Sequence, residues 1–311
     1  MVSDNHVVFV GINDLGVGQV DDEKRYIMKI VGLNGSERKL GNTEILVKEA
    51  LMGAEEEGAQ VEMLRLTDYK VLPCDGLAPC VFGNSRCNLQ DDFNYIVDKI
   101  FEHDGLVLGT PCYILESTAI IKQFIDRAFS VNFRSKARGK PAVIIVPYAT
   151  RGWTPYAFLQ PNMLLLFLGM EVIDRALIHT QAINEVVLYD RALVRAREMG
   201  REVAKAIKKG TTSYRGEPGI CPICHDRVLR ILRDDETVEC GVCGIRGKIR
   251  IEGEKIRVRF DEDAIFKHRF TVENIYRHFT YHIKPSRDYF TRTREMTKEK
   301  RERYREYLKT V

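Results

Sequence analysis

The order of apolar and polar positions along the chain is that of an alternating α/β protein. Apolar segments predict five strands, at 27–32, 60–66, 105–109, 142–146 and 171–178. Helical spacing between them predicts helices over 42–58, 92–103 and 184–209, one that contains 120–129 and one that ends at Gly169. Strands that alternate with helices in this way form a parallel, doubly wound sheet, and such sheets bind ligands at the carboxyl ends of their strands.

The loop after the first strand has the composition of a phosphate site. An apolar run ends at Gly32, and a loop rich in Gly, Ser, Asn and Thr leads into the helix. The first backbone N–H groups of a helix have no partner within it, so they bind anions with the helix dipole behind them. Ser36, Asn42 and Thr43 add side-chain donors, and Arg38 adds positive charge.

This loop has neither the Gly-Lys-Ser/Thr of a Walker loop nor the Gly-x-Gly-x-x-Gly of dinucleotide sites. A loop of hydroxyls and amides suits a terminal phosphate that needs no metal, such as that of flavin mononucleotide (FMN). The alternative is an ordinary strand-to-helix turn with capping residues.

Length and composition narrow the class of protein. A chain of 311 residues predicts two units, one large and one small. No apolar run reaches membrane-spanning length, so we expect a cytoplasmic protein without a membrane partner, whose eight cysteines serve metal or redox sites. Lys and Arg number 25 against 27 Asp and Glu in residues 1–210, but 23 against 17 in 211–311, so the excess positive charge lies in the last hundred residues.

Three segments resemble the flavodoxin-like NAD(P)H-dependent FMN reductase superfamily, over Lys29 to Lys209. They are Gly35-Ser36-Glu37-Arg38-Lys39-Leu40-Gly41-Asn42-Thr43, Gly109-Thr110-Pro111-Cys112-Tyr113 and Lys122-Gln123-Phe124-Ile125-Asp126-Arg127. The resemblance implies bound FMN, a homodimer or homotetramer, and electron transfer from NAD(P)H or a ferredoxin-type donor to an acceptor that the sequence does not identify. It implies that the first loop holds the phosphate and that the Pro-x-Tyr loop lies along the flavin ring.

The loops after the first, third and fourth strands are expected to form one site at the carboxyl edge. Backbone amides near 112–115 can hydrogen-bond a flavin, and Tyr113 offers a flat wall. No catalytic acid or base is named, because the cofactor carries flavin redox chemistry. The predicted phosphate ligands are Ser36, Arg38, Asn42 and Thr43, and the predicted ring contacts are Pro111, Cys112, Tyr113, Ile114, Leu115, Thr150, Arg151, Gly152 and Trp153.

Simpler interpretations are favoured for four of the residues in these segments. Lys122 and the pair Asp126–Arg127 have the spacing of ion pairs on a helix surface. Cys112 is interpreted as a small buried loop residue, because no neighbour in the sequence lowers the pKa of its thiol.

A loop between the second strand and the next helix holds Cys74, Cys80 and Cys87. Iron–sulfur flavoproteins of the same superfamily resemble this arrangement, with four cysteines in this loop, but Leu77 stands at the second position here. A cubane cluster normally takes four thiolates. Three alternatives are open: a three-iron cluster, a four-iron cluster with another ligand such as Asp75, or free cysteines.

The most specific pattern in the chain is a pair of Cys-x-x-Cys motifs that follow a linker at 210–219. Cys221 and Cys224 precede Cys240 and Cys243, with hairpin-like alternation at 227–237 and 247–260. The spacing predicts a tetrahedral metal site in a zinc ribbon. A structural zinc is favoured, and a rubredoxin-like iron is the alternative.

Residues 261–311 return to a helical pattern with many basic and aromatic residues. A helix that packs by its rings and solvates its charges is favoured over nucleic-acid binding. The alternative function, from a different class, is a non-enzymatic adaptor whose ribbon and basic tail contact nucleic acid or protein.

The combined interpretation is an FMN-dependent oxidoreductase with four parts. They are an N-terminal extension at 1–25, a flavodoxin-like domain at 26–210, a four-cysteine ribbon at 219–260 and a basic helical tail at 261–311.

Overall fold

The computed structural model describes residues 26–77, 79–83, 86–216, 220–233 and 236–305. The predicted N-terminal extension lies outside these residues. Within the described chain, no helix combines the length and the apolar character that a membrane span requires.

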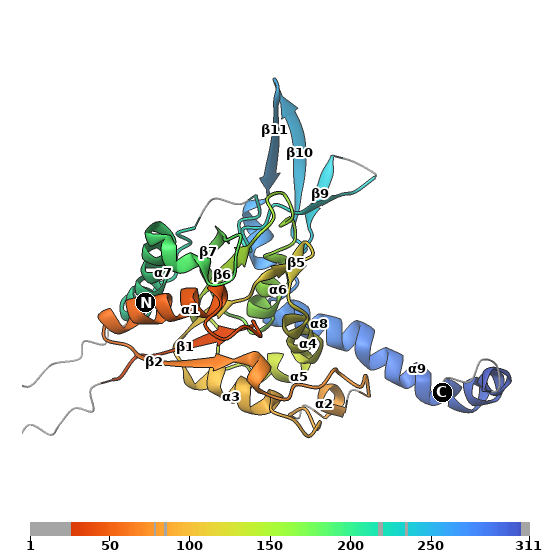
Figure 1. The fold of residues 1–311 in the computed structure, drawn as a ribbon. Helices are drawn as coiled ribbons and strands as arrows, with labels where there is room; N and C mark the ends of the chain where they lie inside the picture. The colour runs from red at the N-terminus through yellow and green to blue at the C-terminus, as the bar shows by residue number, and fades with distance from the viewer. Residues whose placement is uncertain (1–25, 78, 84–85, 217–219, 234–235, 306–311) are drawn as a thin grey trace, which may run out of the picture.

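A five-stranded parallel sheet forms the centre of the molecule, in the order β2-β1-β3-β6-β7 (Figure 1). The strands are β1 (Lys29–Asn34), β2 (Gln60–Arg65), β3 (Gly105–Gly109), β6 (Pro141–Tyr148) and β7 (Glu171–His179). The predicted doubly wound, flavodoxin-like sheet is therefore confirmed, and β1, β3 and β6 lie at its centre because they are apolar on both faces.

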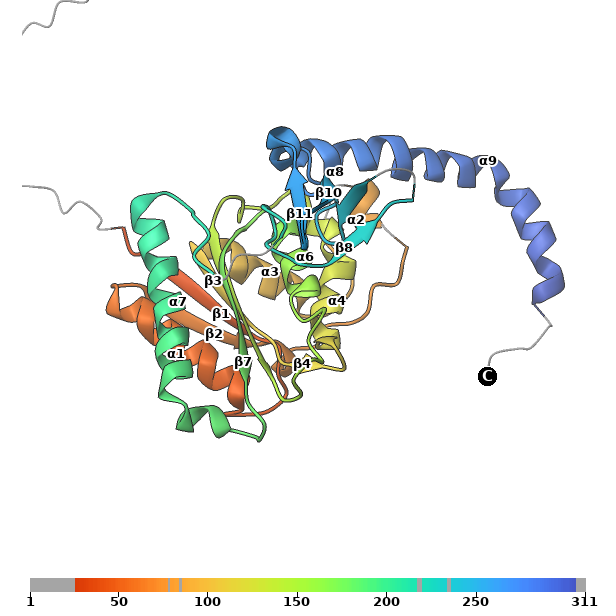
Figure 2. The same cartoon turned by 90° about the horizontal axis from the view of Figure 1, so that it is seen from above.

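Helices cover both faces of this sheet (Figure 2). On one face lie α1 (Asn42–Glu56) and α7 (Asp190–Lys209), and on the other lie α3 (Phe93–Glu102), α4 (Ala119–Arg127) and α6 (Leu159–Phe167). Alternate residues of each strand point into the two apolar clusters. Val31 and Leu33 of β1 face the α3 side, while Ile30 faces the α1 side.

The crossing of α1 over α7 depends on two glycines. A Cβ atom at Gly200 would lie 1.6 Å from the carbonyl oxygen of Ala50, and one at Gly53 would lie 2.0 Å from that of Arg197. Glycine at both positions therefore lets the two backbones meet directly.

Several elements differ from the sequence prediction. The helix predicted over 184–209 begins as a 3₁₀ turn, Glu185–Leu188, after Asn184 takes a left-handed conformation with φ of 62°. The helix predicted through 129 is divided into α4 and α5 (Phe129–Asn132). The loop at 110–116 contains a small hairpin, β4 (Cys112–Tyr113) and β5 (Glu116–Ser117). The three-cysteine loop contains a 3₁₀ turn, Leu66–Asp68, and a short helix, α2 (Pro79–Phe82).

The four-cysteine region forms an antiparallel sheet in the order β11-β10-β9-β8, as the ribbon pattern predicts. Its strands are β8 (Leu229–Ile231), β9 (Thr237–Cys240), β10 (Arg246–Glu252) and β11 (Lys255–Phe260), and the β10–β11 hairpin projects from the body (Figure 1). The four cysteines share an apolar cluster with Leu166 of α6, Phe270 and Ile275, and Phe129 and Phe167 pack against it. The ribbon and the larger sheet domain thus share one core.

The C-terminal segment is helical, with α8 (Val272–His278), a π-helical turn at Phe279–Ile283, α9 (Lys284–Arg301) and a 3₁₀ turn at Glu302–Tyr304. Phe279 packs near Phe82 and Phe133, but α9 then runs away from the body (Figure 2). The prediction that this helix packs by its rings is wrong for Tyr289, Phe290 and Tyr304, which are exposed, whereas the predicted solvation of its charges is correct for 296–305.

Replacement of Gly200 by alanine should lower the free energy of unfolding by about 3 kcal/mol, because α1 and α7 would have to move apart. Urea denaturation measures this loss. Glu198→Ala, at an exposed position of the same helix, should leave the midpoint unchanged, and equal midpoints for the two variants would contradict the close crossing.

Candidate functional site

A cavity of about 680 Å³ lies at the carboxyl edge of the sheet. Seven of the predicted site residues line it together: Ser36, Arg38, Asn42, Thr43, Pro111, Cys112 and Tyr113. The rest of the lining comes from Pro147–Ala149, at the end of β6, and Thr180–Ile183, after β7. The loops after β1, β3 and β6 therefore meet as the topology predicts.

The first turn of α1 offers free backbone donors to this cavity. Its N-cap residue is Gly41, which provides no side-chain cap, and the first intrahelical bond runs from the Ile45 N–H to the Gly41 carbonyl. The backbone N–H groups of Asn42, Thr43 and Glu44 thus lie at the positive end of the helix dipole without intrahelical partners. This is the geometry that holds an anion.

A buried carboxylate organises the turn before this helix. Glu44 accepts a hydrogen bond from the Leu40 N–H at 2.9 Å and pairs with Lys48 at 2.7 Å. Burial alone would raise the pKa of Glu44, but the Lys48 ammonium and the Leu40 N–H hold it below its usual range. Leu40 itself has φ of 50°, so this carboxylate supports a left-handed residue that brings the loop back toward the cavity.

The Asn42 side chain is not free to serve as the predicted phosphate donor. Its Nδ2 donates to the Ala182 carbonyl at 2.8 Å, and its Oδ1 accepts from the Val186 N–H at 3.1 Å. Asn42 therefore fastens the loop after β7 to the first turn of α1, and only its backbone N–H remains for an anion.

That loop, 180–186, is a part of the site that the sequence prediction missed. Its conformation depends on Glu185, whose carboxylate accepts the N–H groups of Gln181 at 2.5 Å and Ala182 at 2.6 Å and the hydroxyl of Tyr189. Applying the carboxyl-edge rule to all five strands would have found this loop, although it carries no motif of its own.

The hairpin β4–β5 is closed by two residues in the left-handed region, Ile114 with φ of 44° and Leu115 with φ of 74°. Such turns usually hold Asn or Gly, and a β-branched residue at positive φ costs about 1–3 kcal/mol. The Leu115 carbonyl accepts a hydrogen bond from the Tyr156 N–H at 3.1 Å, which helps to hold the strained turn. Ile114 is left 82% exposed at the tip of the hairpin, beside the cavity rather than in its lining.

Two threonines connect this hairpin to the first loop. The Thr118 hydroxyl donates to the Gly35 carbonyl at 2.8 Å and lies 3.0 Å from the Thr110 hydroxyl. The predicted phosphate loop and the predicted ring loop are thereby fixed relative to each other.

The remaining predicted ring contacts, Thr150, Arg151, Gly152 and Trp153, are exposed and lie next to the cavity rather than in its lining. The Trp153 carbonyl accepts a hydrogen bond from the Cys112 thiol at 3.4 Å. Burial, reinforced by Glu116, raises the pKa of Cys112, so this thiol has no feature of a reactive group, as the sequence analysis expects.

Within the described residues, the sulfurs of Cys74, Cys80 and Cys87 are not gathered into a ligand group. Cys74 is exposed, whereas Cys87 is buried and its sulfur accepts a hydrogen bond from Arg127 at 3.1 Å. Burial, together with the neighbouring Cys87, raises the pKa of Cys80.

The interpretation of Arg127 as a surface residue is wrong, although Lys122 and Asp126 do form the predicted exposed pair. Arg127 is buried and forms a salt bridge with the buried Asp91, and it also donates to the Leu72 carbonyl at 3.1 Å. Burial alone would raise the pKa of Asp91, but Arg127 holds it below its usual range. Arg127 thus anchors both ends of the three-cysteine loop. Its spacing on the helix had predicted only a partner on the same helix.

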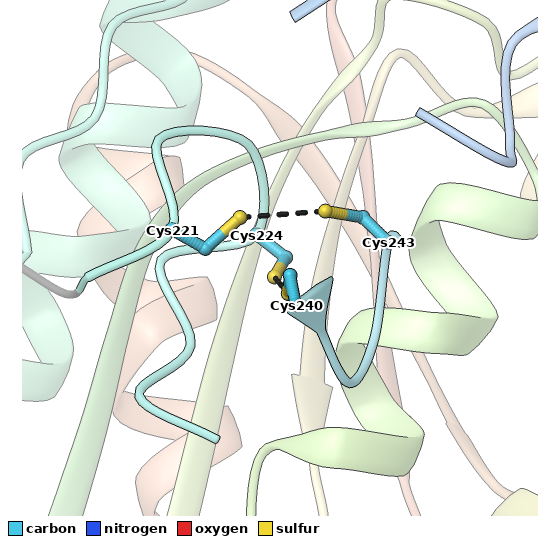
Figure 3. A group of neighbouring side chains, drawn as sticks. All are labelled: Cys221, Cys224, Cys240 and Cys243. Carbon is cyan, nitrogen blue, oxygen red and sulfur yellow. Dashed lines mark hydrogen bonds between the residues drawn. The ribbon is translucent and has the colours of Figure 1, made fainter. Parts of the chain in front are cut away.

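The four ribbon cysteines form the one potential metal-ligand group found among the described residues. Their ligand atoms all lie within 4.8 Å of one another and all four residues are buried. Figure 3 shows the two knuckles bringing the side chains together, with 3.3 Å between the sulfurs of Cys221 and Cys243 and 3.4 Å between those of Cys224 and Cys240. Each knuckle ends in a left-handed residue, His225 or Gly244, as its tight turn requires.

Comparisons with known proteins bear on the family and the fold of this chain. The family model described as NADPH-dependent FMN reductase matches residues 28–182. An iron-sulfur flavoprotein from Methanocaldococcus jannaschii is 31% identical over 190 residues, which cover 58% of this chain and 98% of that protein. A flavone synthase from Aspergillus candidus is 28% identical over 269 residues, which cover 76% of this chain and 82% of that protein. Among solved structures, a flavone reductase has a TM-score of 0.75 at 24% identity and covers 91% of this chain and 99% of its own, so the likeness in fold extends beyond the larger sheet.

Each chain should bind one tetrahedral metal ion at the four cysteines. Cys240→Ser removes one of four thiolates, so it should abolish stoichiometric metal and lower the melting temperature. Metal analysis by mass spectrometry measures the first effect and calorimetry the second. Cys112→Ser, outside the ribbon, should keep the metal, and an equal metal content in both variants would contradict the site.

Proposed function

Because this chain belongs to the NADPH-dependent FMN reductase family and is an FMN-dependent oxidoreductase, we propose that it transfers electrons from a reduced nicotinamide to a small-molecule acceptor. The observation that carries this proposal is the cavity in which the uncapped first turn of α1 meets the loops after β3, β6 and β7. The alternative of a non-enzymatic adaptor is set aside by the family assignment.

The residues of this cavity fit FMN. Backbone N–H groups of Asn42 and Thr43 would hold the phosphate, with the hydroxyls of Ser36 and Thr43 and the exposed Arg38 guanidinium around it. Pro111–Leu115 and Thr150–Trp153 would frame the ring, with Pro111, Cys112 and Tyr113 lining the cavity itself.

When bound, FMN supplies the two-electron chemistry of the reaction. The contribution of the chain is to hold the walls of the cavity, and therefore the cofactor, in position. The strained hairpin tip and the loop of Trp153 are fixed to each other by the Cys112 thiol, and the Glu185 carboxylate fixes the wall that faces them. No side chain is assigned as a general acid or base.

The proposed donor is NADPH or NADH. A ferredoxin-type donor is the alternative, and a homodimer or homotetramer stays a prediction, as do the domain boundaries at 26–210, 219–260 and 261–311.

The proposed metal of the ribbon is zinc. The sulfurs are buried within the core that the ribbon shares with α6, and zinc would stabilise that core without changing redox state. A rubredoxin-like iron is the alternative, and it would give the ribbon visible absorption.

An iron–sulfur cluster at Cys74, Cys80 and Cys87 is a second proposal, favoured by the iron-sulfur flavoprotein relatives. Iron and acid-labile sulfide analysis after purification without air tests it, and the absence of both elements would reject it.

A flavonoid with a conjugated carbonyl group is the proposed small-molecule substrate, and with a reduced nicotinamide as donor the flavone is its electron-accepting form. The match to the flavone synthase extends over 269 residues and therefore beyond the flavodoxin-like part of the chain, whereas iron-sulfur flavoproteins from Methanocaldococcus jannaschii and Archaeoglobus fulgidus match 190 and 191 residues. Consumption of a flavone in the presence of NADPH, followed by chromatography, tests this assignment.

Thr43→Val should weaken FMN binding about tenfold, the loss of one hydrogen bond to a charged group. Thr43 is buried in the cavity lining, and valine keeps its shape while removing the hydroxyl. Fluorescence titration of the apoprotein with FMN measures the dissociation constant. Thr211→Val, at an exposed position beyond α7, is the control, and equal constants would remove Thr43 from the phosphate site.

The visible spectrum of anaerobically purified protein tests the function directly. Resolved flavin bands that bleach on addition of NADPH are the expected result. A colourless protein would overturn the FMN assignment, and flavin bands that NADPH and NADH leave unchanged would overturn the nicotinamide donor.

A further inference from the structure

A second cavity, of about 1070 Å³, lies along the outer edge of β7 and takes no part in the proposed FMN site. Its walls are the β7 residues 175–179, the start of α7, the loop at 154–158 and the ribbon residues 226–228. Its volume is slightly above the usual range for ligand pockets, about 300–1,000 Å³, so it has room for an extended ligand. We call it the β7-edge cavity.

The β7-edge cavity adjoins the cavity of about 680 Å³ at the carboxyl edge, where FMN is proposed to bind and which we call the flavin cavity. β7 lines the first with residues up to His179, and the chain continues directly into Thr180–Ile183, which line the second. The ring of His179 lies edge-on to that of Tyr148, a flavin-cavity residue, with 5.3 Å between ring centroids. A long ligand could therefore reach both cavities past these two rings.

The lining of the β7-edge cavity is cationic. It holds four arginines, Arg175, Arg191, Arg195 and Arg227, against two carboxylates, Asp190 and Asp226. Arg175 is paired with Asp226 at 3.4 Å, and Arg195 with the buried Asp174 at 2.6 Å. Arg191, in the first turn of α7, is exposed and has no ion pair with any of the described residues.

The same cavity has an apolar side that suits a flat ring. Tyr189, Pro155 and Leu177 lie in the lining, and Tyr189 and Leu177 are 38% and 39% exposed. A ligand that carries an aromatic base and several negative charges matches both parts of the lining.

We propose that the β7-edge cavity binds the adenosine-phosphate end of the nicotinamide donor, with Arg191 contacting a phosphate. This inference rests on the proposed function, because it takes the donor to be NADPH or NADH. The nicotinamide end then reaches the flavin cavity past His179 and Tyr148.

The ribbon acquires a role in this proposal, because it builds one wall of the cavity. The Asp226 carbonyl accepts the Cys221 N–H at 3.0 Å, and Arg175 donates to the Cys224 carbonyl at 3.4 Å. The first metal-binding knuckle thus positions the wall that contains Asp226 and Arg227.

Steady-state oxidation of NADPH by the holoenzyme, with ferricyanide as acceptor, tests the proposal through Arg191→Ala. The KM for NADPH should rise about tenfold while kcat and the bound flavin are retained, as expected for the loss of one charge-assisted contact. Arg201→Ala is the matched control, since Arg201 lies on the same helix but pairs with Glu56. It should change neither constant.

Calorimetric titration of the oxidised holoenzyme with ADP gives a readout that needs no turnover. ADP should bind the unmodified protein, and Arg191→Ala should weaken that binding about tenfold. Unchanged KM and unchanged ADP affinity in Arg191→Ala would overturn the inference, as would a rise in the KM of the acceptor alone. A holoenzyme that oxidises neither NADPH nor NADH would instead reject the proposed function, and if it also fails to bind ADP, the adenosine site is rejected independently.

Discussion

The uncapped N-terminus of α1 is the interaction on which the arrangement of the site depends. Helices usually satisfy their first N–H groups with a side chain, but Gly41 provides none. The carboxylate of the nearby Glu44 is instead bound by the Leu40 N–H before the helix and by Lys48 one turn further on, so it supports the loop without occupying the donors. Asn42 in turn holds the loop after β7 against this turn, and Thr118 holds the hairpin loop to Gly35. The other walls of the carboxyl-edge cavity are therefore attached to this one helix end.

The parts of this structure that were predictable from sequence are those encoded by local pattern. Continuous apolar runs identified the buried strands, and a polar loop before a helix identified a segment that lines the cavity at the carboxyl edge, because both depend on residues close together in the chain. The two Cys-x-x-Cys motifs predicted a ligand group that the fold does bring together. The loop at 180–186 could not be recognised in the same way, since it contributes mainly backbone and is shaped by Glu185 and the distant Asn42.

Arg127 and the aromatic residues of α9 show the same limit from opposite directions. Helical spacing predicted a local partner for Arg127, but its partner is Asp91, 36 positions away in the chain. Its side chain is also buried, which no local pattern reveals. The rings of α9 suggested packing, yet the ring that packs is Phe279, in the segment before it, and α9 then runs away from the body (Figure 2). The side of a helix that meets the core depends on contacts between residues far apart in the sequence, which a local pattern does not contain.

The core shared by the ribbon and α6 has a practical consequence for the minimal enzyme. A chain cut after 210 would keep every strand of the parallel sheet, and it would look complete by comparison with relatives that match only that part. The cut would also remove the ribbon residues that cover Leu166 and the aromatic rings of Phe129 and Phe167, and would expose a contiguous apolar surface to water. We expect such a fragment to self-associate, because the ribbon covers part of the apolar surface of the flavodoxin-like part.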